Sequence, residues 1–439
     1  MTGKVRGIGA VLAAVALVAA GCGGDEEGGG PAEGSLKGQT VEVAAVWSGA
    51  EQEKFKAVLD AFEKSTEATV NYTSTGDDIA TVLGGQIEGG KPPDVAVLPQ
   101  PGLMNDLAKQ GALKPLNDKA SGAVSENYAE VWKTLGTAED GKLYGVWVKA
   151  ANKSLMWYST TAFEDAGVEP PKTWDELKTA LSTISDSGLA PLSVAGADGW
   201  TLTDWFENVY LQVAGPENYD KLAKHEIKWT DQTVKDTLKI LSELWGGENT
   251  VSGGPKGALS VKFEQSVSNV FGDNPKAAIV FEGDFVGGVI GSESKAKVGE
   301  TAKFFSFPEV KAGAGNSVVG AGDVAVALKD SKGAMGLLEY LATPEAAEIW
   351  AAQGGFVSPN KSVNLEKYAD NPTREIAKAV VESGDQFRFD LSDLQPAAFG
   401  ATVGKGMWKV LQDFLGNPTS VDATASKLEA EAAKAYGGN

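Results

Sequence analysis

The sequence has 439 residues and a formal net charge of −20 at neutral pH, with one cysteine, one histidine and eleven tryptophans. With one cysteine it can form no internal disulfide and no cysteine-based metal site, and a lone histidine, His225, disfavours Ser-His-Asp chemistry and paired-histidine zinc sites. The acidic balance excludes a nucleic-acid partner, because phosphates would be repelled. We find no motif for catalysis, a metal or a cofactor. His225 itself is expected to be solvated.

The first 21 residues have the pattern of a secretory signal. Lys4 and Arg6 precede an apolar run over 8–20, which is too short to span a bilayer, and small residues lead to Cys22. The segment Ala-Ala-Gly-Cys at 19–22 resembles the lipobox of bacterial lipoproteins, and this resemblance implies cleavage before Cys22 and diacylation of its sulfur. An ordinary signal peptide and a buried N-terminal helix stay open as alternatives. Residues 22–38 are rich in glycine and acidic residues, which predicts a flexible tether.

Strands and helices alternate over the next part of the chain. Apolar runs and helical spacing predict strands over 41–46, 69–72 and 94–98 and helices over 51–64, 78–87 and 103–110. This order is typical of βαβ units with parallel strands. A chain of this length exceeds one hydrophobic core, so two lobes are expected.

The rest of the chain predicts further strands and several capped helices. Thr173 and Glu176 have the spacing of a capping box, so Trp174 is expected to pack at that helix start rather than bind a ligand. Thr203 is expected to cap the next helix, with Trp200 in front of it and Trp205 off its apolar stripe. The remaining predicted strands cover 143–149, 154–158, 277–281, 303–307 and 323–328, and the remaining helices 335–341, 344–353, 405–415 and 421–436.

Six segments in order give the chain a familiar pattern. They are VWSGAEQEKFKAVLDAFEKSTEATVNY, PPDVAVLPQPGLMNDLAKQGALKPL, GKLYGVWVKAANKSLMWYSTTAFEDAGVEPPKTWDEL, KAAIVFEGDF, GAGDVAVAL and LLEYLATPEAAEIWAAQGGFVSPNKSV. With them the chain resembles the extracellular solute-binding proteins of bacterial ABC sugar importers, the group that includes maltose-binding protein, and more weakly its α-glucoside-type members. The resemblance implies an α/β, type II periplasmic-binding-protein-like fold, in which two hinged lobes close around a central ligand cleft.

The same resemblance implies the lobe boundaries and the partners. An N-terminal lobe is expected over 39–147 and 306–343, and a C-terminal lobe over 148–305 and 344–439. The partners would be a mono- or oligosaccharide, the transmembrane subunits of an ABC permease, and the membrane through the lipid on Cys22. The protein would then be a monomer held on the outer face of the cell membrane, without a cofactor.

Candidate ligand residues follow from what a sugar needs. Its ring faces stack on aromatic side chains and its hydroxyls pair with carboxylates, amides and backbone groups. In open α/β folds the ligand cleft lies at the carboxyl ends of the strands. The candidates at or near such strand ends, with the Trp200 segment added by the resemblance, are Trp47, Ser48, Glu51, Gln100, Trp147, Trp200, Trp205, Glu282, Asp284, Phe285, Gly322, Asp323 and Phe356.

Two points about these candidates stay open. For each single aromatic a purely structural role is an alternative to ligand contact. The family often has Gly-Trp at the strand end where this chain has Gly283-Asp284-Phe285, so Phe285 would stack more weakly and Asp284 would add a hydroxyl partner.

Other functions compete with sugar binding. A secreted glycosidase would need two carboxylates about 5 to 9.5 Å apart, and Glu51 with Asp284 is one candidate pair. A binding protein for a polyamine, a peptide or an anion is the other alternative. The acidic composition suits a polyamine, whereas the tryptophans suit a sugar better. Whether a divalent ion binds the acidic loop at 76–78 stays open.

Overall fold

The computed structural model describes residues 36–313, 317–382 and 387–437. The predicted signal peptide, Cys22 and the tether up to residue 35 lie outside the described residues. Residues 32–439 form one unit. Within the described ranges, no helix combines the length and the apolar character that crossing a membrane requires.

Most predicted elements are present, with ends shifted by a few residues. The strands are β1 (Thr40–Ala45), β2 (Thr69–Ser74), β3 (Val95–Leu98), β4 (Gly145–Asn152), β5 (Leu155–Ser159), β6 (Ala190–Ser193), β7 (Ala277–Glu282), β8 (Ala302–Ser306), β9 (Val318–Ala327) and β10 (Phe387–Phe389). The helices are α1 (Gly49–Thr66), η1 (Gly76–Asp78), α2 (Ile79–Glu88), α3 (Pro101–Lys109), α4 (Asp118–Asn127), α5 (Glu130–Leu135), α6 (Thr160–Ala166), α7 (Trp174–Asp186), α8 (Trp200–Ala214), α9 (Pro216–Ala223), α10 (Gln232–Gly246), α11 (Gly254–Ala258), α12 (Phe263–Phe271), α13 (Val286–Glu293), α14 (Lys332–Leu341), α15 (Pro344–Ala351), η2 (Leu365–Lys367), α16 (Asn371–Glu382), α17 (Leu391–Leu394), α18 (Ala397–Gly400), α19 (Gly406–Gly416) and α20 (Val421–Gly437).

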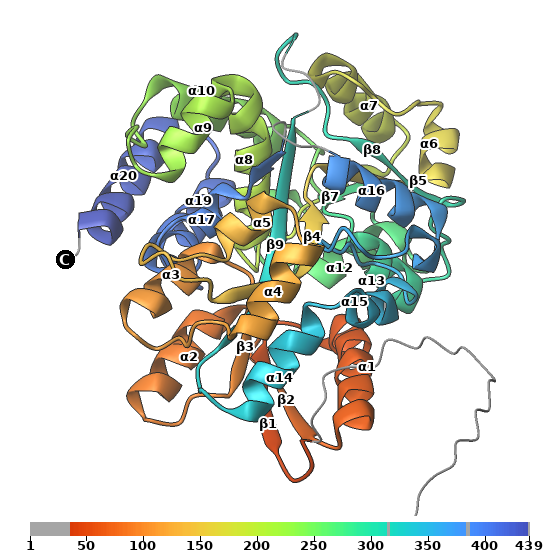
Figure 1. The fold of residues 1–439 in the computed structure, drawn as a ribbon. Coiled ribbons are helices and arrows are strands. Elements are labelled where there is room, and N and C mark those ends of the chain that lie inside the picture. The colour runs from red at the N-terminus through yellow and green to blue at the C-terminus, as the bar shows by residue number, and fades with distance from the viewer. Residues whose placement is uncertain (1–35, 314–316, 383–386, 438–439) are drawn as a thin grey trace, which may run out of the picture. The chain divides into compact units, whose positions relative to one another are not determined.

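The larger sheet contains the first three strands, as the βαβ pattern predicts. Its order is β10-β9-β3-β1-β2. Strand β4 also pairs with β9, along the edge of β9 opposite to β3. Strand β1 runs parallel to β2 and β3, whereas the later strand β9 runs antiparallel to both β3 and β4. The carboxyl ends of β1, β2 and β3 therefore lie at one edge of this sheet. Helices α1, α2, α3 and α14 surround it in the lower part of Figure 1.

A second, smaller sheet has the order β6-β7-β5-β8. Strand β7 is parallel to β6 and antiparallel to β5. Helices α6 to α10 lie in the upper part of Figure 1, on the side of the molecule away from β1 to β3. The described residues thus contain two sheets, each with helices packed around it.

The helix starts confirm one capping prediction and correct another. The capping box of Thr173 and Glu176 is present, and Trp174 is buried against Phe307. The prediction that Thr203 caps its helix is wrong. Helix α8 already begins at Trp200, and the Thr203 hydroxyl donates to the Trp200 carbonyl inside the helix.

Gly199 explains this earlier start. Its φ is +86°, and a Cβ at this position would lie 2.9 Å from Cβ of Trp408. A glycine can adopt the conformation and tolerate the close approach, so the chain enters the helix three residues before the threonine.

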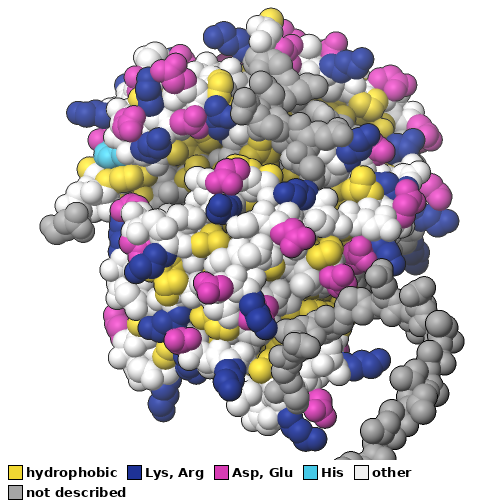
Figure 2. All heavy atoms as spheres, viewed as in Figure 1, with side chains coloured by type: hydrophobic (Ala, Val, Ile, Leu, Met, Phe, Trp, Pro, Cys, Tyr) yellow, Lys and Arg dark blue, Asp and Glu magenta, His cyan; other side chains and the backbone are white. Residues whose placement is uncertain are grey.

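His225 is not fully solvated, in contrast to the prediction. It follows α9 with a φ of +56°, and its half-buried ring lies 3.3 Å from the Glu429 carboxylate. The visible face of the molecule otherwise carries acidic and basic side chains interspersed with scattered apolar atoms (Figure 2).

Candidate functional site

A cavity of about 290 Å³ lies where the strand ends of the larger sheet meet residues of the second sheet and its helices. From the first side come the turn after β1, the η1 turn after β2 and the turn after β3. From the other side come the starts of α8 and α12 and the turn after β7. The rule that ligands bind at the carboxyl ends of strands thus selects a real cavity of this chain.

Eight of the thirteen candidate residues line this cavity together. They are Trp47, Ser48, Glu51, Gln100, Trp200, Phe285, Gly322 and Asp323. Three aromatic rings and several polar groups therefore converge on one space, which is the composition expected of a small-molecule site.

An ion pair, Lys149 with Glu51, lies in the cavity wall among aromatic rings. Lys149 is buried on β4 and its Nζ donates to Oε1 of Glu51, in the first turn of α1. The same ammonium lies 5.2 Å from the centroid of Phe285 and 5.9 Å from that of Trp47. Burial opposes its charge, but Glu51 and Asp323 raise the pKa of Lys149 above its usual value. Lys149 therefore stays charged, and the pair presents donors and acceptors beside apolar ring faces.

A β-bulge explains why Trp147 is not in the cavity lining although Lys149 is. Residues 147 and 149 would share one face of a regular strand. The register of β4 against β9 shifts between them, so the two side chains lie in different surroundings. Trp147 is buried against Trp132 and Phe389.

The other four candidates also lie outside the lining. Trp205 is buried against Phe281 and Phe307, and Phe356 stacks on Trp350. Asp284, expected to face a hydroxyl, accepts instead from the backbone N–H of Asn152 at 2.6 Å.

Glu282 is the fourth of these. It is buried, and burial together with the nearby carboxylate of Asp204 raises the pKa of Glu282 well above its usual value.

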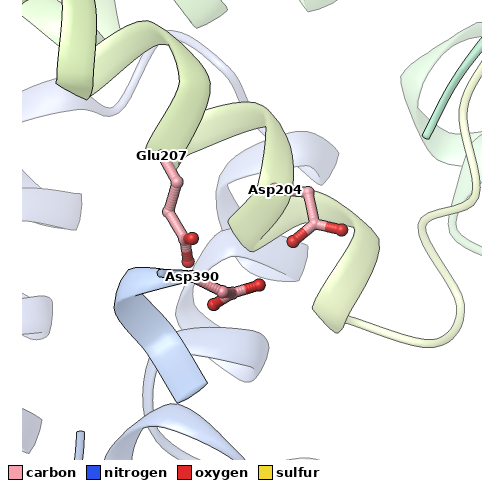
Figure 3. Close-up of side chains that lie close together, drawn as sticks. All are labelled: Asp204, Glu207 and Asp390. Atoms are coloured by element: carbon pink, nitrogen blue, oxygen red, sulfur yellow. The ribbon is translucent and has the colours of Figure 1, made fainter. Parts of the chain in front are cut away.

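Beneath the cavity lies a buried cluster of charges around Lys153. Its ammonium is 3.1 Å from Asp204 and 2.6 Å from Asp390, and Asp390 and Glu207 approach each other (Figure 3). The three carboxylates have the proximity of a metal site. Most of their oxygens are nevertheless engaged by the protein. Lys153 pairs with Asp204 and Asp390, and Glu207 accepts from the N–H groups of residues 391 and 392, whereas Oδ2 of Asp204 has no hydrogen-bond partner among the described residues. We therefore interpret the cluster as structural.

Several of the buried carboxyl groups in and near this cluster have raised pKa values. Burial raises the pKa of Asp204 to about 7, against the opposing effect of Lys153. Burial likewise raises the pKa of Asp323 to about 7 and that of Asp284 to about 6. By contrast, Lys153 and neighbouring donors hold the pKa of Asp390 at about 2, although burial opposes this. Neutral and ionised carboxyl groups thus coexist beneath one cavity.

Sequence reasoning missed a group of residues at the rim of the cavity. Asp77 comes from η1, Asp198 from the loop before α8, and Lys262, Phe263 and Glu264 from the start of α12. Trp408 from α19 also lines the cavity. The acidic turn at 76–78 was noticed as a feature, but nothing in the spacing joins it to residues 198 and 264.

Comparisons with known proteins agree with this geometry. Residues 47–348 match the family model of the bacterial extracellular solute-binding proteins. The chain belongs to this family. It is a family of binding proteins and not of enzymes, so the glycosidase alternative is abandoned. Asp284, one carboxylate of the pair considered for a glycosidase, lies outside the cavity lining.

Relatives match over nearly the full length. The alpha-glucosides-binding periplasmic protein AglE of Rhizobium meliloti is 37% identical over 90% of this chain and 87% of its own. The osmoprotective compounds-binding protein GgtB of Synechocystis is 33% identical over 86% of this chain and 88% of its own. Among solved structures, the bacterial solute receptor AcbH superposes with a TM-score of 0.79 at 20% identity, over 91% of this chain and 99% of its own. The fold is therefore that of the type II solute-binding proteins.

Proposed function

We propose that this protein captures a carbohydrate, in the first place an α-glucoside, and delivers it to the permease of an ABC transporter. The observation that carries the proposal is the cavity itself, which Trp47, Trp200 and Phe285 line together with the Lys149–Glu51 ion pair. Aromatic faces match the apolar faces of a sugar ring, and the charged pair offers donors and acceptors for hydroxyls. The likeness to AglE supports the ligand class.

The size of the cavity favours a small ligand. About 290 Å³ lies near the lower end of the range of roughly 300–1,000 Å³ that is typical of ligand pockets. We therefore expect one or two sugar rings rather than a long oligosaccharide to fit between the two sides.

A ligand screen tests this proposal. The purified protein is heated with glucose, galactose, maltose, trehalose, sucrose and raffinose, and separately with spermidine and a tripeptide mixture. A ligand that binds only the folded state stabilises it by about 2.7 kcal/mol at 100 times its Kd. We expect an α-glucoside to raise the melting temperature and to bind with 1:1 stoichiometry in calorimetry. Stabilisation by spermidine or peptide alone would contradict the proposal.

We further propose that the protein is held on the outer face of the membrane by a lipid on Cys22. The support is the small-residue sequence before this cysteine, and the lack of order-promoting apolar residues after it. The replacement Cys22→Ser should leave the protein unlipidated and release it into the medium. Mass spectrometry of the membrane fraction checks this, and a variant that keeps the same lipid mass would refute the anchor.

A further inference from the structure

The charges that line the cavity are unbalanced. Three lysines lie in the lining, at 149, 153 and 262, and two of them are already paired, Lys149 with Glu51 and Lys153 with Asp204 and Asp390 below the lining. Against them the lining carries six carboxyl groups, which are Glu51, Asp77, Asp198, Glu264, Asp323 and Asp393.

Three of these carboxyl groups meet at the rim. Asp77 comes from η1 beside the larger sheet, whereas Asp198 and Glu264 come from the opposite side of the cavity. Asp198 is fixed there because its Oδ2 accepts from the N–H of Phe263 at 2.7 Å, at the start of α12. The groups that act on Asp77 are the carboxylates of Asp198 and Glu264, the ammonium of Lys262 and a hydrogen bond from the Trp200 side chain. Three acidic groups thus outnumber one cation at this rim.

We propose that Asp77, Asp198 and Glu264 act as a charge filter, which admits neutral and amino sugars and repels sugars that carry a carboxylate or a phosphate. This inference rests on the proposed function, since it concerns which sugars enter the same cavity. The physical reason is that an anionic ligand would approach negative charges at distances below the Debye length at low salt, which is about 10 Å at 0.1 M and shorter at higher salt. An ammonium group on a sugar would instead be attracted by the same groups.

The filter depends on pH because Asp77 titrates near neutrality. Burial and the neighbouring carboxylates raise the pKa of Asp77 to about 6, against Lys262 and the Trp200 hydrogen bond, and burial also raises the pKa of Asp198. Asp77 is therefore mostly ionised at pH 7.5 and mostly neutral at pH 5. A uronate remains ionised at both values. Rejection of a uronate should thus weaken as the pH falls.

Matched sugars test the filter in the full-length protein. The probes are maltose, its analogue with a carboxylate in place of the 6′-hydroxymethyl group, and its analogue with an aminomethyl group there. Glucose, glucuronate and glucosamine repeat the comparison for a single ring. Calorimetry at pH 7.5 and low salt should show that the carboxylate-bearing analogue binds at least tenfold more weakly than the neutral sugar. The amino analogue should bind at least as tightly as the neutral sugar. At pH 5, or in 0.5 M salt, the ratio of neutral to anionic affinity should fall.

Isosteric variants assign the effect to the rim. Changing all three groups with Asp77→Asn, Asp198→Asn and Glu264→Gln should bring the ratio of neutral to anionic affinity close to one. Lys262→Gln should increase the ratio. A matched control removes three charges from exposed positions outside the lining and should leave the ratio unchanged; its substitutions are Glu126→Gln, Glu164→Gln and Asp165→Asn.

The outcomes separate the two proposals. A natural-sequence protein that binds the uronate as tightly as the neutral sugar refutes the filter but leaves sugar binding intact. A protein that binds none of the neutral sugars refutes the proposed function and the filter with it. If the triple variant does not fold, the pH and salt dependence of the natural sequence still decides, because a filter predicts that both reduce the discrimination.

Discussion

At the scale of single residues, two tryptophans of the cavity are packed very differently. Trp47 is 4% exposed, and its ring contacts Phe55 and Trp350 at centroid distances of 4.8 and 4.9 Å. Trp200 is only half-buried, at the start of α8, and contacts Phe263 and Phe285 at longer distances of 5.4 and 6.0 Å. Trp200 therefore has more of its ring free for a ligand, whereas Trp47 also supports the core.

This difference gives a prediction for alanine replacements. Trp200→Ala should weaken sugar binding by about 1–3 kcal/mol, as is usual for an aromatic anchor, with a small loss of stability without ligand. Trp47→Ala should lower the free energy of unfolding by about 3–5 kcal/mol in addition to any loss of affinity, because it leaves a cavity among packed rings. Calorimetry with sugar and urea unfolding without sugar measure the two effects separately.

The control for this pair is Trp245, which is fully buried against Phe414 away from the cavity. Trp245→Ala should lower stability and leave the affinity of the remaining folded protein unchanged. Full affinity in Trp200→Ala would show that its ring is structural.

The sequence could predict the residues that directly follow strands, such as Trp47, Gln100 and Phe285, because their place in the cavity depends only on where a strand ends. It could not predict which side chains a β-bulge would remove from the cavity lining. Trp147 and Lys149 have the same spacing as any pair on one strand face, and the shift in register arises only from pairing with β9, some 170 residues later in the chain. The rim acids at 198 and 264 were missed because only the folded chain brings them to Asp77.

At the scale of elements, the capping box of α7 is a local feature distant from the cavity. The Thr173 side chain accepts from the Glu176 N–H, and the Glu176 carboxylate accepts from the N–H of Thr173. Thr173→Ala should therefore lower the free energy of unfolding by about 1 kcal/mol, the usual effect of losing such a cap. Sugar affinity should stay the same. Thr173→Ser is the matched control and should retain most of the stability, and an equal loss in both variants would contradict the capping explanation.

Elements defined by local patterns were predicted well, and those defined by distant pairing were not. The strand–helix alternation and the capping box follow from short-range spacing, so they could be read from the sequence. That β9 and β10 join the sheet of β1 to β3 could not, since β9 pairs with β3 across more than 200 residues and β10 pairs with β9 across about 70. The start of α8 could not be predicted because the constraint on residue 199 comes from Trp408. This tryptophan lies far along the chain and leaves no room for a Cβ at residue 199.

At the scale of the whole molecule, buried carboxyl groups make stability depend on pH. The pKa values of Asp204 and Asp323 are about 7 and that of Asp284 is about 6, compared with an ordinary value of 3.8. Between pH 4 and 7 the folded state therefore binds more protons than the unfolded state, and the free energy of unfolding falls as the pH rises. Asp390, with a pKa of about 2, has the opposite effect only below pH 4.

The prediction is that the melting temperature without ligand is higher at pH 5.5 than at pH 8. Scanning calorimetry measures it, in 0.5 M salt so that long-range repulsion among the surface acids is screened. Asp204→Asn and Asp323→Asn should each flatten the profile, because an amide needs no proton. Asp165→Asn, at an exposed position, should not. A melting temperature that rises from pH 5.5 to pH 8 would contradict the protonation of these groups.

We expect the two sides of the cavity to close on the ligand. The cavity takes residues from the edge of the larger sheet and from α8, α12 and the end of β7, so a sugar that fills it contacts both sides at once. Such a ligand binds the closed arrangement better than the open one, and this difference in affinity shifts the population. The permease would then recognise the closed form, in which surfaces of both sides are aligned.

Small-angle X-ray scattering of the lipid-free protein tests closure directly. The radius of gyration, about 22 Å for a compact chain of roughly this length, should decrease when a bound sugar is added to saturation. Tryptophan emission should change together with it, because Trp47 and Trp200 line the cavity. Trp200→Ala, at a sugar concentration too low to fill its weakened site, should show neither change, and the same variant at saturating sugar should recover the compaction. An unchanged radius at full occupancy, with binding verified by calorimetry, would mean that the cavity is preformed and that the permease recognises the ligand by some means other than closure.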